Sequence, residues 1–242
     1  MHAQVVLTML AEGVIVSSVI NQIIESIPAD ALVIDMSSTA QSEALALHRL
    51  LAERGLNCLD APVSRGVLGA ATGDQAIMVG GTKENFPRAL PLFDVLGHAT
   101  LVGGAGAGQV AKLCNQLIVG GTLNLVAEAL LLAESAGADP TAVRRALRGG
   151  FAESRILEVH GQRMLDRDFR PGGQIKSQLK DLENVLQAAA AVGLNLPLAE
   201  LVSAHYGSIL STLATADQAA ILLALEQVNP GRRLGTAEDK MP

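Results

Sequence analysis

A glycine-rich stretch near the middle of the chain separates two parts with different sequence patterns. It runs from Gly103 to Gln116 and reads GGAGAGQVAKLCNQ. Before it, short apolar runs alternate with amphipathic segments, whereas nearly every segment after it has helical periodicity. Glycines permit a tight turn and the close approach of a ligand. We therefore predict domains over residues 1–104 and 105–228, followed by a disordered tail over residues 229–242.

The first part is predicted to be a doubly wound parallel sheet with helices on its faces. Its apolar runs are short and rich in β-branched residues, as expected for buried strands. The predicted strands are Ala3–Leu10, Ala31–Met36, Asn57–Val63, Ala76–Val79 and Ala99–Val102. The predicted helices are Val14–Ile27, a segment ending at Arg54 that Ser38 and Gln41 would cap, and Thr82–Gly97. A loop rich in small residues is expected over Ser64–Gly73.

The second part is predicted to be all-helical. A long helix starts near Gly106 or Ala107, joins the two domains and ends before Gly137, a residue type that commonly stops helices. The further predicted helices are Pro140–Leu147, Ser154–Arg167, Leu179–Val192, Leu198–Leu213 and Ala216–Gln227. The fold class is therefore α/β followed by all-α.

Composition narrows the class of protein. Hydrophobic residues make up 49% of the 242 residues and aromatic residues 2%, so the core has to consist of Ala, Leu, Val and Ile. The net charge of −6 gives no sign of a nucleic-acid surface. No apolar run reaches the roughly 18 residues of a membrane span, and the N-terminus lacks the basic start of a signal peptide. The sequence predicts a cytoplasmic protein that binds neither nucleic acid nor membrane.

The cysteines and histidines indicate neither disulfides nor a metal. Cys58 and Cys114 both lie among apolar residues, which predicts reduced core thiols. The five histidines are scattered without metal-ligand spacing, and no metal site is expected. A G-x-S-x-G elbow of the hydrolase type is also missing from the sequence.

A lysine and an amide share one face of the predicted long helix. Gly108, Lys112 and Asn115 stand at i, i+4 and i+7, with Gln109 and Gln116 beside them. A lysine can serve as a general acid for carbonyl reduction if burial lowers its pKa toward neutrality. The alternative is a lysine that extends from a half-buried face to solvent. The pattern makes Lys112 and Asn115 the catalytic candidates.

Ser64 follows a predicted strand, at the carboxyl edge where doubly wound sheets bind ligands. Its hydroxyl and the N–H groups of Arg65 and Gly66 form a candidate site for a substrate carboxylate. The alternative is a turn serine that caps its own loop.

The start of a dinucleotide-binding fold is missing. Such a fold opens with a strand, a G-x-G-x-x-G turn and a helix, and nothing before Ala3 supplies the turn. Gly103–Gly108 is not a substitute, because it follows the last predicted strand of the domain. We therefore expect a truncated Rossmann-like domain, from an N-terminal truncation or a misplaced start at Met1.

Three blocks, in order and at a similar spacing, resemble the β-hydroxyacid dehydrogenase family, which includes 3-hydroxyisobutyrate dehydrogenases and relates to 6-phosphogluconate dehydrogenase. The segment Asp60–Gly66 resembles the substrate-binding motif of that family, and Gly106-x-Gly108-x-x-x-Lys112-x-x-Asn115 resembles its catalytic motif. Lys180-Asp181-Leu182 resembles its cofactor-side motif. The stretch Gly150–His160 is most similar to that of tartronate semialdehyde reductases. The resemblance covers about Gln4 to Gln227.

This resemblance implies an NADP- or NAD-dependent oxidoreductase. It would reduce tartronate semialdehyde (2-hydroxy-3-oxopropionate) to glycerate, or oxidise a similar 3-hydroxy acid. The apolar face of the long helix suggests a homodimer, as in the family, or a higher homo-oligomer. Lys112 would be the general acid/base, and Asn115 would bond the substrate hydroxyl or the lysine. The remaining implied sites are Ser64, Arg65 and Gly66 for the substrate, and Met9, Leu10, Ser38, Thr39, Gly106 and Lys180 for the cofactor, with Lys180 reaching across a cleft.

Several alternatives stay open. The family usually has glycine at position 65, so the Arg65 Cβ either demands a strained φ or the guanidinium adds a contact to an anion. Helix capping explains Ser38 and Thr39 equally well, and Lys180 with Asp181 can be a solvated pair. The competing function is a non-catalytic remnant that dimerises or binds small carboxylates without cofactor. Preference for NAD or NADP is not encoded in the residues present.

Overall fold

The computed structural model describes residues 3–242, apart from the side chain of Leu68. Contacts divide the chain into two compact units. The sheet unit extends to Asn115 and includes Gln187–Gly193, and the helical unit comprises Gln116–Leu186 and Leu194–Pro242. The division therefore falls within the long helix, later than the boundary we predicted after residue 104.

The sheet unit is built on a six-stranded sheet among the described residues. Its strands are β1 (Val5–Thr8), β2 (Leu32–Asp35), β3 (Asn57–Asp60), β4 (Val63–Ser64), β5 (Gln75–Gly80) and β6 (Gly97–Gly103). β1, β2 and β3 are parallel neighbours, and β6 runs parallel to β5. β5 is antiparallel to both β3 and β4. The predicted α/β class is confirmed, and the sheet is mainly parallel with one reversal that the apolar runs did not reveal.

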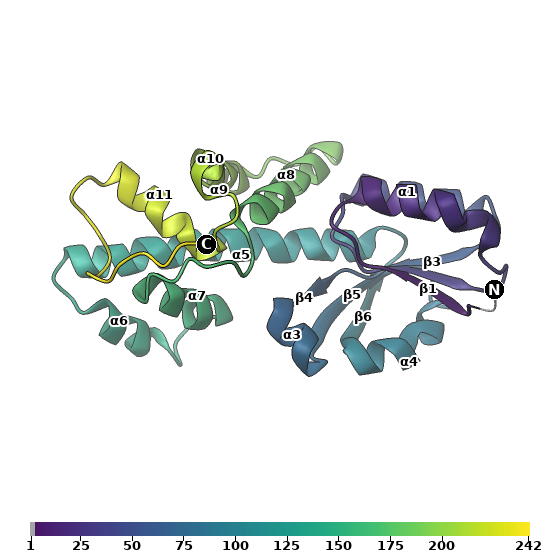
Figure 1. Ribbon diagram of the computed structural model, residues 1–242, viewed down its shortest axis with the longest axis horizontal. Helices are drawn as coiled ribbons and strands as arrows, with labels where there is room; N and C mark the ends of the chain where they lie inside the picture. Colours follow the sequence, from purple (N-terminus) through teal and green to yellow (C-terminus); the bar gives the residue numbers. More distant parts are fainter. Residues whose placement is uncertain (1–2) are drawn as a thin grey trace. The chain divides into compact units, whose positions relative to one another are not determined.

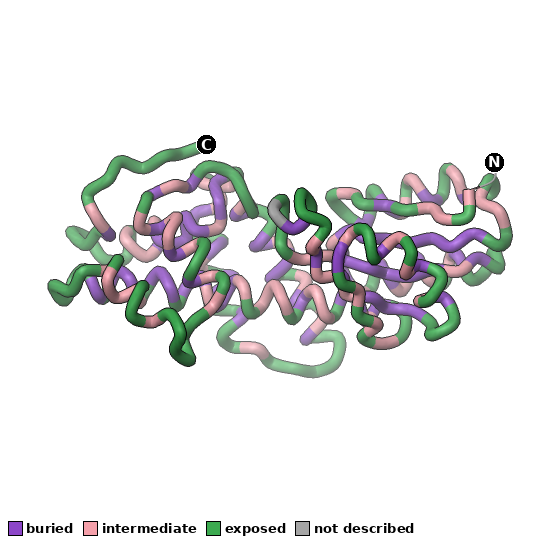
Figure 2. The backbone as a smooth tube through the Cα atoms, turned by 90° about the horizontal axis from the view of Figure 1, so that it is seen from below, coloured by how far each residue is buried: buried purple, intermediate pink, exposed green. Residues whose placement is uncertain are grey.

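Helices cover both faces of this sheet (Figure 1). They are α1 (Gly13–Ile23) with the 3-10 turn η1 (Ile24–Ser26), α2 (Gln41–Ala52), α3 (Gly66–Thr72) and α4 (Phe86–Leu96). On one face, Ile20 of α1 and Leu47 of α2 pack with Val33 of β2. On the other, Phe93 of α4 packs with Ile77 of β5. The central strands are correspondingly the most buried segments of the unit (Figure 2).

Two predictions about the helices and loops of the sheet unit were wrong. α2 begins after Ala40, whose N–H donates to the Glu43 carboxylate at 2.8 Å, so Ser38 and Gln41 do not form the expected capping box. The predicted loop Ser64–Gly73 contains α3, because its alanines favour a helix once the turn at its start has been made.

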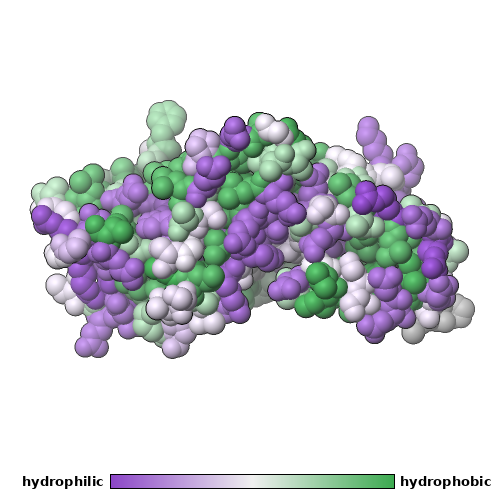
Figure 3. All heavy atoms as spheres, turned by 90° about the horizontal axis from the view of Figure 1, so that it is seen from above, coloured by the Kyte–Doolittle hydropathy of each residue, from purple (hydrophilic) through white to green (hydrophobic). Residues whose placement is uncertain are grey.

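β1 was predicted to be a buried strand, but it lies at an edge of the sheet. It pairs with β2 on one side, and within residues 3–242 no strand pairs with its other side. Leu7 is consequently 41% exposed. Val14 and Ile15 on α1 are exposed as well, and hydrophobic atoms gather over this helix in Figure 3.

The helical unit consists of helices packed around an aliphatic core. The helices are α5 (Ala107–Ser135), which begins in the sheet unit, α6 (Pro140–Leu147), α7 (Arg155–Leu165), α8 (Ile175–Ala191), α9 (Pro197–Ser208), α10 (Leu210–Leu213), the 3-10 turn η2 (Gln218–Ala220) and α11 (Ile221–Val228). Leu130, Leu182 and Ile221 are fully buried in it. The predicted helix Leu198–Leu213 is interrupted at Ile209, whose non-helical backbone places its side chain in the core.

Residues 229–242 do not form the predicted disordered tail. Leu234 is fully buried, and the Lys240 N–H donates to the Arg167 C=O at 2.9 Å. The Arg167 guanidinium also pairs with Asp239. One buried leucine and these polar contacts hold a segment of polar composition against the helical unit.

α5 is both long and apolar. By length and composition alone it could cross a membrane, but core helices of soluble proteins meet the same criterion, and 44% of its most apolar window is buried. Val110, Cys114 and Ile118 lie on an exposed face. Cys58 is buried as predicted, whereas Cys114 is not a core thiol; both are free.

Candidate active site

The buried carboxylate of Asp60 fixes the start of α5. Asp60 ends β3 and is 1% exposed. Its Oδ1 accepts the N–H of Gly106 at 2.8 Å and lies 2.9 Å from His48 Nε2, and its Oδ2 accepts the N–H of Gln109 at 3.0 Å. A carboxylate at this position satisfies N–H groups that a helix N-terminus leaves unpaired and complements the helix dipole. The strand therefore determines where the helix begins.

The glycines at this junction let main chains approach each other rather than a ligand. A Cβ at Gly108 would lie 2.4 Å from the Met78 carbonyl oxygen and 2.5 Å from that of Asp60. Gly106 has a φ of +77° and is buried, and its N–H is engaged by Asp60. This N–H already donates to the Asp60 carboxylate, so it does not support the predicted contact between Gly106 and a cofactor.

The structure brings the predicted substrate loop and the predicted catalytic helix together. The Ser64 hydroxyl donates to Asn115 Oδ1 at 3.3 Å. Lys112 lies on the same helix one turn before Asn115 and is half-buried. A hydroxyl, an amide and an ammonium group therefore lie on neighbouring segments of the sheet unit.

Arg65 adopts the strained backbone that one of the two alternatives predicted. Its φ is +90°, in the left-handed region that residues with a Cβ disfavour, and Gly66 follows with a φ of +57°. The Arg65 guanidinium lies 2.5 Å from Asp74 and is 43% exposed. His98 lies 3.2 Å from the same carboxylate. The guanidinium is thus held by a surface ion pair, while the N–H groups of the turn remain the candidates for an anion.

A second hydrogen-bond network joins the carboxyl ends of β1 and β2. Asp35 Oδ1 accepts the hydroxyl of Thr8 at 2.9 Å and the N–H of Ser37 at 3.0 Å. The Ser37 hydroxyl in turn accepts the N–H of Leu10 at 2.8 Å. Burial raises the pKa of the Asp35 carboxyl, with the nearby charge of Asp60 adding to the effect. The network fixes the two loops that carry the predicted cofactor contacts.

The predicted cofactor residues on these two loops differ in how exposed they are. Met9 is 56% exposed and Ser38 is half-buried, so both present atoms to a ligand. Thr39 is 3% exposed, and its N–H donates to Gln109 Oε1 at 3.1 Å. Thr39 therefore shapes the loop, whereas Ser38 is the more exposed of the two residues. Sequence reasoning placed Gln109 on a polar stripe but missed its role here.

Lys180 belongs to the helical unit, on α8. Its Nζ lies 3.3 Å from Asp181 Oδ1. Asp181 is buried and its Oδ2 accepts Gln116 Nε2 at 2.7 Å, while Gln178 Nε2 donates to the Gln116 C=O at 3.0 Å. The lysine is thus attached to a buried polar network, which the alternative of a fully solvated pair did not foresee.

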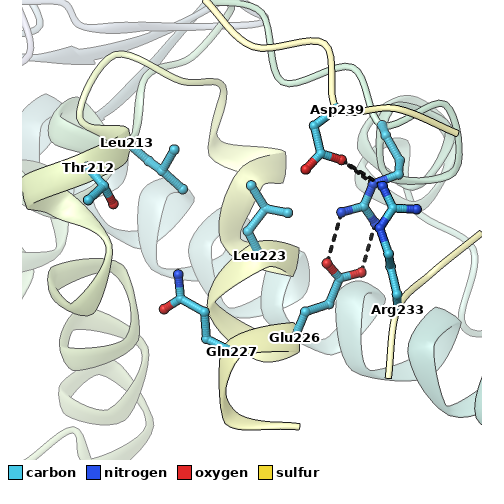
Figure 4. A pocket seen from close by; sticks show the side chains of 8 residues that line it. Thr212, Leu213, Leu223, Glu226, Gln227, Arg233 and Asp239 are labelled. Atoms are coloured by element: carbon cyan, nitrogen blue, oxygen red, sulfur yellow. Dashed lines mark hydrogen bonds and ion pairs between the residues drawn. The ribbon is translucent and has the colours of Figure 1, made fainter. Parts of the chain in front are cut away.

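The helical unit also contains an open pocket of about 500 Å³ (Figure 4). Arg167 bonds both oxygens of Glu226 there, at 2.8 and 2.9 Å, and pairs with Asp239. Burial alone would lower the pKa of Arg167, but the two carboxylates raise it above its ordinary value. Among the described residues that line this pocket, none is a predicted site residue, and its charged groups satisfy one another. Nor do the described residues include a group of three side chains suited to a metal.

Comparison with known proteins identifies the family. The NAD binding domain of 6-phosphogluconate dehydrogenase matches residues 1–104, and the NAD-binding domain of NADP-dependent 3-hydroxyisobutyrate dehydrogenase matches residues 106–225. The 2-hydroxy-3-oxopropionate reductase of Escherichia coli is 48% identical over 80% of this chain and 67% of its own length. A probable 3-hydroxyisobutyrate dehydrogenase of Mycobacterium tuberculosis is 32% identical over 93% of this chain and 79% of its own.

A solved structure agrees with these relatives. The Mycobacterium tuberculosis 3-hydroxyisobutyrate dehydrogenase with L-serine superimposes with a TM-score of 0.85 at 30% identity, covering 93% of this chain and 80% of the other. The chain thus spans 67% to 80% of the length of the relatives described. The predicted family resemblance, fold class and cofactor class are confirmed. This chain belongs to the 3-hydroxyisobutyrate dehydrogenase-like family of NAD(P)-dependent β-hydroxyacid dehydrogenases.

Proposed function

We propose that this chain reduces 2-hydroxy-3-oxopropionate to glycerate with NADPH or NADH, or oxidises a similar 3-hydroxy acid. The hydrogen bond between Ser64 and Asn115 carries the proposal, because it holds the predicted substrate loop on the helix that bears Lys112. The 48% identity to a reductase named for this substrate favours it over other hydroxy acids.

Each site residue has a role in this proposal. The Ser64 hydroxyl and the N–H groups of Arg65 and Gly66 bind the substrate carboxylate. Asn115 orients the carbonyl oxygen, and Lys112 Nζ gives it a proton, so that the aldehyde oxygen becomes a hydroxyl. In the oxidation direction Lys112 accepts the same proton.

The loops after β1 and β2 fit the nicotinamide end of the cofactor, which supplies the hydride when it is bound. Met9 and Ser38 are accessible at the carboxyl edge of the sheet, where α/β sheets bind ligands. Leu10 and Thr39 hold these loops through their N–H groups. Lys180 is the proposed cofactor contact from the helical unit.

The proposal includes a homodimer in the cytoplasm. Ile118, Leu125 and Leu132 recur at seven-residue intervals on α5 and are 65%, 59% and 69% exposed. Such a stripe is suited to packing against a second copy of the helix. The two free thiols are compatible with a reducing compartment.

Cofactor binding followed by turnover tests the function. NADPH is titrated into the chain and followed by fluorescence, with NADH alongside, and NADPH oxidation is then measured with 2-hydroxy-3-oxopropionate. Lys112→Met should lower kcat by about 100-fold or more, as expected for loss of a general acid, with NADPH affinity unchanged. Lys83→Met, at an exposed lysine of the sheet unit, is the matched control and should retain kcat.

Absence of cofactor binding up to millimolar concentration in a folded protein would contradict the proposal. It would favour a protein that binds small carboxylates without a cofactor. Binding with turnover that survives Lys112→Met would instead remove the assigned proton donor.

A further inference from the structure

Gln109 joins α5 to the loop that follows β2. Its Oε1 accepts the N–H of Thr39 at 3.1 Å, and its Nε2 donates to the C=O of Ser37 at 2.8 Å. The residue has no exposed surface. One side chain therefore bonds the main chain on both sides of Ser38, the accessible residue of that loop.

The main chain of Gln109 is itself fixed. Its N–H donates to Asp60 Oδ2, beside the bond that holds Gly106 to the same carboxylate. Lys112 follows three residues later, within the next helical turn. A rigid helix segment thus connects Gln109, whose side chain bonds the loop after β2, to Lys112, the proposed proton donor.

The residue type matters as much as the position. A primary amide supplies one acceptor and one donor, which match the N–H of Thr39 and the C=O of Ser37. A carboxylate or a hydrocarbon side chain of similar size would leave at least one of these buried groups without a partner, which is costly. Few side chains other than glutamine can hold this loop from this helix.

We propose that Gln109 is a positioning residue, which sets the place of Ser38 relative to Lys112. The inference rests on the proposed function, in which the nicotinamide lies at Ser38 and the aldehyde at Lys112. Hydride transfer requires the two reactants to be held within a narrow range of distances, and a displacement of about 1 Å costs on the order of 100-fold in rate. Gln109 would act on kcat without touching either reactant.

Two variants separate positioning from general stability. Gln109→Met removes both side-chain hydrogen bonds but leaves the bond from the main-chain N–H to Asp60. Gln109→Glu keeps an acceptor for Thr39 and places a carboxyl against the Ser37 C=O. Asp35 bonds the N–H of Ser37, and Asp60 bonds the N–H of Gln109 and lies beside His48. The negative charge of the two carboxylates favours the protonated form of the introduced carboxyl. Protonation restores the missing donor.

Amide hydrogen exchange is the first readout and requires no activity. In Gln109→Met, exchange of the Thr39 N–H should accelerate by about tenfold or more, whereas the N–H of Val110 within α5 should be unaffected. Turnover is the second readout: kcat should fall by about tenfold or more while KM for 2-hydroxy-3-oxopropionate stays within about threefold. In Gln109→Glu, exchange of the Thr39 N–H and kcat should both move toward the wild-type values measured at the same pH as the pH is lowered. Gln22→Met and Gln22→Glu, on the exposed side of α1, are the controls and should change neither readout.

The outcomes distinguish this inference from the proposed function. A wild-type chain that binds NADPH but shows no turnover refutes the proposed function, while amide exchange still decides whether Gln109 holds the loop. Unchanged exchange of Thr39 in Gln109→Met overturns the inference whatever the activity. If Gln109→Met accelerates exchange of the Thr39 N–H but leaves kcat unaltered in an active enzyme, the inference is overturned as well. Gln109 would then hold the loop without any consequence for the reaction.

Discussion

The Asp60 carboxylate accepts the N–H of Gly106 at 2.8 Å, and this bond fixes the first turn of the helix that carries Lys112. Two elements distant in sequence, β3 and α5, meet at this one side chain. The contact lies on the side of the helix away from solvent, and the same carboxylate also bonds Gln109 and His48. Asp60 therefore belongs to the scaffold of the site, although its motif was assigned to substrate binding.

Replacing this carboxylate should destabilise the fold. Asp60→Ala leaves the N–H groups of Gly106 and Gln109 buried without a partner, and the expected loss is about 3 kcal/mol in the free energy of unfolding. Urea denaturation measures it. Asp94→Asn, at an exposed carboxylate of α4, is the control and should change stability by less than about 0.5 kcal/mol. An equal effect of the two substitutions would contradict the role of Asp60.

Two glycines on α5 should respond to alanine in opposite directions. Gly108→Ala forces a Cβ to within 2.4 Å of the Met78 carbonyl oxygen, a backbone atom that cannot rotate away, and should cost about 3 kcal/mol. A Cβ at Gly121 meets nothing within 4 Å, so Gly121→Ala should stabilise the helix by about 1 kcal/mol. Thermal unfolding of both variants tests the pair. The same sign for both would show that the packing at Gly108 is not as tight as described.

The strain at Arg65 can be measured by comparing two substitutions. Arg65→Ala and Arg65→Gly both lose the ion pair with Asp74, but only the glycine variant relieves the strain of a φ of +90°. The glycine variant should therefore be more stable than the alanine variant by about 1 kcal/mol in urea denaturation. Equal stabilities would mean that the left-handed backbone at this position is not strained.

Burial within the helical unit lowers the pKa of His205 below its ordinary value of 6.5, and its Nδ1 lies 2.5 Å from Asn124 Oδ1. The unfolded chain therefore binds a proton at a higher pH than the folded chain does. The stability contributed by the neutral imidazole is present above pH 6.5 and is lost as the pH falls through the lower folded pKa, by at most about 1.4 kcal/mol per pH unit.

His205→Gln should remove that part of the pH dependence. Urea denaturation between about pH 8 and about pH 5 gives, for each protein, the slope of the free energy of unfolding against pH. Gln22→Met, at an exposed residue of α1 without a titratable group, is the control and should keep the wild-type slope. A slope that is identical in the wild type and in His205→Gln would refute the assignment.

The apolar stripe on α5 leads to a test of the proposed homodimer. Leu125→Glu places a charge in the middle of the stripe and should convert a dimer to a monomer, as measured by light scattering after size exclusion. Val95→Glu puts the same charge at an apolar residue of α4 with 72% exposure and should leave the mass unchanged. A wild-type chain that is already monomeric at high concentration would exclude this interface.

Hydrophobic periodicity was sufficient for most helices and strands, and it failed where side chains from distant segments decide the structure. The helix Pro140–Leu147 was predicted with its observed bounds, since Pro140 and a local cap from Asp139 define its start. The break at Ile209 and the packed segment around Leu234 were not predictable, because both depend on the core of the helical unit.

By itself, the sequence determined the family, the α/β-then-helical organisation and the candidates Ser64, Lys112 and Asn115, because spacing along one helix and short motifs are local properties. Only the tertiary structure decided how these candidates are held. Asp60 and Gln109 act through hydrogen bonds across 46 to 72 positions of the chain, and a buried carboxylate or amide acquires such partners only when the fold closes around it.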